Sequence, residues 1–306
     1  EKFSARGRTI PDSNRNQAIK PDIGEVIPNP VGSARGLHFT HNHYDCFAMP
    51  GVPSEMKAMM LATILPWIAS KSEVKHHITI MRTTGIMESA LYEKIDAIIK
   101  DYPKVNVAFL PRFTGVDLRI SSTDEDAINT WIDLVSPIIK KYHFGGEGVA
   151  LEDAVGELLI NCGKTIATAE SCTGGLIGDR FTNVSGSSAY YKGGIVSYSN
   201  EVKHDMLDVK KDTLETYGAV SEETALEMAI GVRKKLSSDI GLSTTGIAGP
   251  TGGTDEKPVG LIYVGLSHEN GEKVYKFTFT PSRLTNKLMT SQAALNITRL
   301  YLLYGS

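Results

Sequence analysis

The interpretation of this chain begins with eight residues, Thr168-Ala169-Glu170-Ser171-Cys172-Thr173-Gly174-Gly175. They follow a short β-branched run at residues 165–167, and residues 176–181 after them have the pattern of a first helical turn. Paired glycines allow close backbone approach, and the unpaired N–H groups of a helix start point at an anionic ligand. The stretch therefore predicts a strand that delivers hydroxyl groups and a thiol to an anion-binding turn. A glycine-rich turn made only for packing is the alternative.

Two later stretches favour a binding pocket over a packing turn. Residues 185–191 are rich in Ser and Gly and are followed by a strand-like run that continues to residue 203. Residues 244–253 again place small, hydroxyl-bearing and glycine residues where a loop should begin. Three such loops in one domain predict a shared pocket.

These three stretches carry a family resemblance, together with Glu256-Lys257-Pro258-Val259-Gly260. From about Leu151 to the end, the chain closely resembles the CinA/PncC family. The resemblance implies the characteristic activity of that family, which is deamidation of nicotinamide mononucleotide. The substrate would be a small-molecule pyridine nucleotide, and the reaction needs no cofactor.

An amide hydrolase needs a nucleophile, a base and donors for the oxyanion. Histidine is the usual base, but His204 is the only one near the pocket motifs. A lysine can replace it if burial or a neighbouring cation lowers its pKa towards neutrality. By resemblance, the catalytic serine, tyrosine and lysine of the family fall on Ser188, Tyr198 and Lys203, with Ser171 as a further catalytic residue.

Other residues are assigned to substrate binding. Spacing does not choose between Ser187 and Ser188 as the nucleophile. Cys172 is expected to be structural, because no His–Asp pair is evident to activate it. The candidate donors to the substrate phosphate are the backbone of residues 173–175, the loop at residues 246–253 and Arg283. The expected substrate-binding set is Thr173, Gly174, Gly175, Ser187, Thr245, Gly246 and Arg283.

The overall composition is that of a globular protein of about two domains or more. The 306 residues are 41% hydrophobic and 22% charged, with a net charge of −3. This balance gives no support to nucleic-acid binding, which normally leaves a basic footprint. Three unpaired cysteines, no signal peptide and no long apolar run predict a cytoplasmic protein without a membrane segment. The chain starts at Glu1 without an initiator methionine, which raises the expectation of a fragment.

The predicted fold class is α/β with three parts. Residues 1–72 resemble the second half of the molybdopterin-binding-like domain of full-length CinA proteins, without the glycine-rich nucleotide loop of its first half. Residues 73–145 show a βαββα order, which corresponds to the KH-like middle domain of the family. This part has no G-x-x-G loop between its helices, so we expect a spacer or a homodimer contact rather than RNA binding. Residues 146–306 form the deamidase domain, with a mixed sheet flanked by helices.

A metal site in the first part is the less favoured alternative. His41, His43 and Asp45 would share one face of a strand. A polar surface hairpin explains the same residues, so we expect no metal there.

Two other functions compete with deamidation. One is a pyridine-nucleotide pyrophosphatase that works through the first part and needs a divalent metal. The other is a non-catalytic, competence-associated module that binds nucleotide without turnover.

Overall fold

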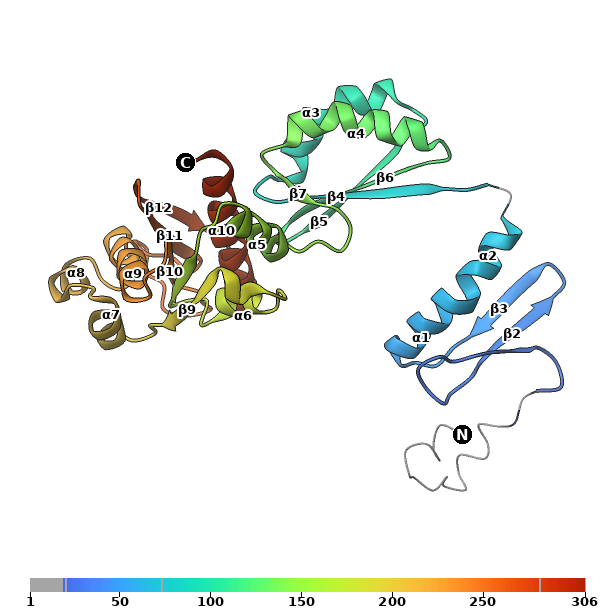
Figure 1. The fold of residues 1–306 in the computed structure, drawn as a ribbon, viewed down its shortest axis with the longest axis horizontal. Helices are drawn as coiled ribbons and strands as arrows, with labels where there is room; N and C mark the ends of the chain where they lie inside the picture. The colour runs from blue at the N-terminus through green and yellow to red at the C-terminus, as the bar shows by residue number, and fades with distance from the viewer. Residues whose placement is uncertain (1–18, 20, 73, 281, 306) are drawn as a thin grey trace. The chain divides into compact units, whose positions relative to one another are not determined.

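The computed structural model describes residues 19, 21–72, 74–280 and 282–305, which form two compact units, residues 1–75 and 76–306 (Figure 1). Both units contain strands and helices, so the predicted α/β class is confirmed. No helix within these described ranges is long and apolar enough to cross a membrane.

The first unit pairs a small antiparallel sheet with one long helical segment. Met59 and Ile64 of this helical segment are buried against Ile27. The expected polar hairpin is present, and Asp45 accepts hydrogen bonds from His38 and Thr40. The elements are β1 (Glu25–Ile27), β2 (Gly36–His41), β3 (Tyr44–Ala48), α1 (Pro53–Met59), the π-helical turn η3 (Met60–Ile64) and α2 (Leu65–Lys71).

The second unit begins with a four-stranded antiparallel sheet in the order β5-β6-β4-β7. Figure 1 shows α3 and α4 on the same face of this sheet, and their buried side chains, Trp131 among them, form one core with Leu118. The predicted βαββα order is confirmed, and residues 143–145 add a further strand that pairs with β4. The elements are β4 (His77–Thr83), α3 (Glu88–Asp101), β5 (Asn106–Arg112), β6 (Gly115–Ser122), α4 (Glu125–Ile139) and β7 (His143–Gly145).

The rest of this unit is built on a five-stranded mixed sheet in the order β12-β11-β10-β8-β9. Strand β8 (Ile166–Glu170) is fully buried. It lies between β9 (Tyr191–Val196) and β10 (Ile240–Gly246) and pairs with both in parallel. The carboxyl ends of these three strands therefore meet at one edge, which is the usual ligand edge of an open α/β sheet. The other two strands, β11 (Leu261–His268) and β12 (Gly271–Thr278), form a hairpin at Asn270-Gly271, a pair of residues typical of hairpin turns.

Helices cover both faces of this sheet. On one face, apolar residues of α5 and α10 are buried against the sheet. On the other face, Met228 and Val232 of α9 pack against Leu207 of α7. Ser221 caps α9 (Glu222–Lys235), because its hydroxyl accepts from the N–H of Thr224. The helices are α5 (Leu151–Asn161), α6 (Leu176–Thr182), the 3-10 turn η4 (Ser187–Ala189), α7 (Asn200–Leu207), α8 (Lys211–Thr216), α9 (Glu222–Lys235) and α10 (Arg283–Tyr304).

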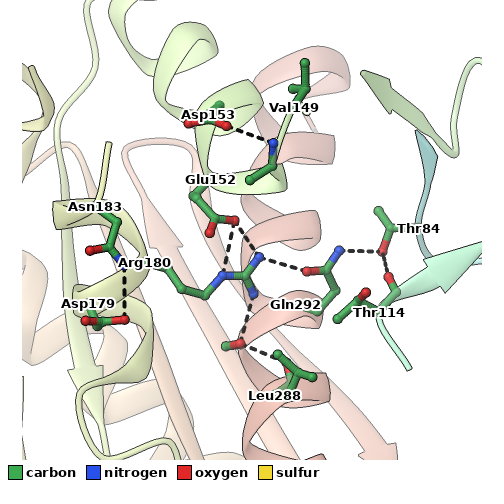
Figure 2. A network of polar contacts seen from close by, with 12 residues as sticks. Thr84, Thr114, Val149, Glu152, Asp153, Asp179, Arg180, Asn183, Leu288 and Gln292 are labelled. Atoms are coloured by element: carbon green, nitrogen blue, oxygen red, sulfur yellow. Dashed lines mark hydrogen bonds and ion pairs between the residues drawn. The ribbon is translucent and has the colours of Figure 1, made fainter. Parts of the chain in front are cut away.

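A polar network on α10 joins the two sheets of the second unit (Figure 2). Gln292 donates to Thr84 Oγ1 at the end of β4 and accepts from Arg180 of α6. Arg180 also pairs with Glu152 of α5 at 2.7 Å. Arg299, which is only 2% exposed, donates to the backbone carbonyls of Lys141, after α4, and of His143, the first residue of β7. These contacts fix α10 against both α6 and the preceding domain.

Close packing of α7 against α9 depends on Gly231. A Cβ atom at this position would lie 1.9 Å from the carbonyl oxygen of Leu207, so the two helices could not keep their separation. We expect Gly231→Ala to lower the free energy of unfolding by about 1–3 kcal/mol, the usual cost of overpacking. Gly146→Ala is the control, because the nearest atom to its Cβ would be 3.7 Å away. Equal urea midpoints for both variants would contradict the packing argument.

Candidate active site

The turn between β8 and α6 is held by one buried carboxylate. Glu170 is 2% exposed and accepts from the N–H groups of Gly175, Ile177 and Gly178 at 2.8–3.0 Å. Gly175 has a φ of 95°, which favours glycine. The three N–H groups are therefore engaged by the protein itself, contrary to the prediction that the start of α6 binds the ligand anion.

The same turn places Ser171 at the carboxyl end of β8. Its N–H donates to the carbonyl of Thr244 on the adjacent strand β10 at 2.9 Å, which fixes the backbone. Its side chain accepts a hydrogen bond from Lys203 Nζ at 3.1 Å. Ser171 is 9% exposed, so it lies at the inner wall of a cavity rather than on the surface.

Lys203 is the buried cation of the site. It comes from α7, whose N-terminus is capped by the hydroxyl of Ser199, and it is 1% exposed. Its ammonium donates to the backbone carbonyls of Ser197 at 2.7 Å and Tyr198 at 3.2 Å, both of which follow β9. Burial lowers the pKa of Lys203 to about 8, since no described carboxylate pairs with it.

A cavity of about 190 Å³ opens beside this pair. Thr245 and Gly246 of β10 form part of its wall, and Thr245 Oγ1 donates to the carbonyl of Ala219 at 2.6 Å. Arg283, the first residue of α10, donates to Gly249 O and to the hydroxyl of Tyr198. Tyr198 is 63% exposed, so its ring lies at the mouth of the cavity.

The predicted pairing of Ser188 with Lys203 is wrong. Ser187 and Ser188 lie in η4, just before β9, and the carbonyl of Tyr190 pairs with the N–H of Ile166 at the start of β8. Lys203 instead contacts residues beyond the carboxyl ends of these parallel strands. The two places are separated by the length of β8, on the order of 15 Å. The sequence could not show this, because Ser188 is nearer to Lys203 along the chain than Ser171 is.

Comparisons with known proteins agree with this fold. The family model of the CinA C-terminal domain matches residues 149–302. The family model of the damage-inducible protein CinA KH domain matches residues 79–145. A CinA-like protein of Chloroherpeton thalassium is 44% identical over 314 residues, covering 97% of this chain and 74% of that protein. A CinA-like protein of Nostoc punctiforme is 42% identical over 318 residues, covering 99% and 76%. The chain belongs to the CinA family.

A solved CinA-family structure supports the fold of the second half. The competence damage-inducible protein A of Klebsiella pneumoniae is 30% identical, with a TM-score of 0.50. The match covers 51% of this chain and 97% of that one. The printed names of these CinA relatives state no reaction, so the chemistry has to be argued from the site.

The remaining predicted residues of the CinA domain lie in the turn that follows β8. Thr173 is fully buried, and its hydroxyl bonds that of Thr244 at 2.7 Å, so it braces the turn. Gly174, with a φ of 62°, lies at the outer side of the same turn. Cys172 is buried, and burial raises the pKa of its thiol to about 12, which keeps it protonated. This agrees with the expectation that it is structural.

Sequence reasoning missed two residues of this CinA site. Glu170 was quoted in the first motif without a role, although a carboxylate before a glycine-rich turn is suited to accept N–H bonds at a helix start. Lys287 is the other. It lies one turn after Arg283 on α10, and a Cβ at Gly174 would be 3.5 Å from its ammonium. More than a hundred residues separate Lys287 from Gly174 along the chain, so only the fold brings them together.

The metal alternative concerned the polar residues of the hairpin formed by β2 and β3. No group of three or more His, Cys, Asp or Glu residues in the described part of the chain is placed to hold a metal ion. His38, rather than His41 or His43, is the histidine that contacts Asp45.

The lowered pKa of Lys203 predicts a pH-dependent stability. Between pH 8 and 10.5 the unfolded chain binds the lysine proton more tightly than the folded chain does, so raising the pH stabilises the fold. Relative to Lys203→Met, the free energy of unfolding of the unaltered chain should rise by about 3 kcal/mol across this window. Urea unfolding at several pH values measures it, with Lys192→Met, an exposed lysine, as the control. If the free energy of unfolding depends on pH in the same way for the unaltered chain and for Lys203→Met, the lowered pKa of Lys203 is refuted.

Proposed function

We propose that this chain hydrolyses the amide of nicotinamide mononucleotide, giving nicotinate mononucleotide and ammonia. The observation that carries the proposal is the hydrogen bond between Lys203 and Ser171 inside a small cavity. A lysine with a pKa of about 8 is partly neutral near physiological pH, and only the neutral form can act as a base. The choice of nicotinamide mononucleotide as the substrate rests on the resemblance to the CinA/PncC family.

The proposed nucleophile is Ser171 rather than Ser188. In the first step, the neutral amine of Lys203 takes the proton of the Ser171 hydroxyl while Oγ bonds to the amide carbon. The C–N bond then breaks, and the proton passes from Lys203 to the leaving nitrogen, which departs as ammonia. Water attacks the resulting ester with Lys203 again as base, releasing the carboxylate and the free serine.

Other groups support this chemistry. Backbone N–H groups of the turn after Ser171 are the candidate donors to the oxyanion. Arg283 holds the hydroxyl of Tyr198 at 3.0 Å, so Tyr198 closes the cavity mouth instead of relaying a proton between Lys203 and Ser188. The reaction uses protein groups alone. The expected homodimer, the cytoplasmic location and any metal-dependent activity of the first unit stay predictions.

Ammonia release from nicotinamide mononucleotide tests the proposal. We expect the unaltered chain to release ammonia with and without a chelator, and Ser171→Ala to lose turnover by about 10³-fold or more. Ser188→Ala is the matched control and should keep near-normal turnover, because Ser188 lies at the other end of β8. Loss of activity in Ser188→Ala but not in Ser171→Ala would refute the assignment. Binding without ammonia release by the unaltered chain would identify a non-catalytic module.

A further inference from the structure

Lys287 places a cation over the glycine turn that follows Ser171. It lies on α10, one turn beyond Arg283, and is half-buried. A Cβ atom built on Gly174 would lie 3.5 Å from Lys287 Nζ, so the ammonium faces the open side of this turn. Gly174 has no side chain to fill that space.

This ammonium is uncompensated. Lys287 forms no hydrogen bond or ion pair with any residue that the structure describes. The nearby carboxylate of Glu170 is already saturated by three N–H groups. Arg283, on the same helix, donates to two neutral acceptors, Gly249 O and the hydroxyl of Tyr198. A partly desolvated cation without a partner is costly unless a ligand supplies the anion.

The substrate of the proposed reaction carries its anion at the end opposite the amide. With the amide at Ser171, the phosphate must lie outside the small inner cavity. The N–H groups at the start of α6 are not available to it, because Glu170 occupies them. A side-chain cation beyond the turn is therefore needed, and Lys287 is placed to provide it.

We propose that Lys287 binds the substrate phosphate and makes the site select a nicotinamide mononucleotide over the corresponding nucleoside. This inference rests on the proposed function, and it names a specificity residue that the sequence patterns did not indicate. Lys287 takes no part in bond making or breaking.

The test compares binding of nicotinamide mononucleotide and nicotinamide riboside by calorimetry. The full chain is used with Ser171→Ala, so that turnover does not consume the ligand. We expect the mononucleotide to bind more tightly than the riboside. Lys287→Met should reduce this preference about ten- to hundredfold, the range of a hydrogen bond to a charged group. Lys287→Arg should restore most of the preference, because the positive charge is kept.

The outcomes separate this inference from the proposed function. An unchanged preference in Lys287→Met, or equal weakening for both ligands, overturns the role of Lys287 even if the unaltered chain releases ammonia. A Lys287-dependent preference without ammonia release by the unaltered chain supports the phosphate site and overturns the deamidase. If neither ligand binds, both proposals fail. Lys192→Met, at an exposed position on β9, controls for a general loss of positive charge.

Discussion

The site depends on the burial of the Lys203 ammonium without a carboxylate partner. Removing a charge from water is costly, and here only a hydroxyl and two backbone carbonyls replace the solvent. The pKa therefore falls to about 8, and a lysine becomes able to act as a base. The carbonyls are fixed because β9 ends beside β8, and α7 is held in place by its contact with Gly231 of α9. Packing far from the cavity thus sets its chemistry.

A second buried charge, that of Glu170, decides where a substrate anion can bind. Its carboxylate closes the turn by accepting three N–H bonds, which orients Ser171 towards Lys203. A glycine-rich turn at a helix start is often an anion site, but here the anion belongs to the protein. The remaining cations near the cavity come from α10. The same helix is tied to α6 through Gln292 and Arg180, so both sides of the site are joined by one polar network (Figure 2).

Much of the fold could be predicted from the sequence, and the site only partly. The βαββα order of residues 73–145 follows from local hydrophobic patterns, and it is confirmed. Membership of the CinA family is confirmed as well. The sequence pointed to Ser188 as the nucleophile, which the structure does not support. Strand order and strand direction decide which loops meet, and the spacing of residues along the chain reveals neither. Ser188 and Ser171 flank parallel strands at opposite ends, whereas sequence distance favoured Ser188. The partner of Gly174 on α10 is more than a hundred residues away, so only the fold could reveal it.

The identity of the esterified serine tests the central claim most directly. The full chain is mixed with nicotinamide mononucleotide, quenched in acid, digested and analysed by mass spectrometry for a peptide that carries the substrate acyl group. The account predicts an ester on Ser171, because its hydroxyl alone contacts the buried amine of Lys203 among the described serines. An ester on Ser187 or Ser188, or a thioester on Cys172, would contradict it.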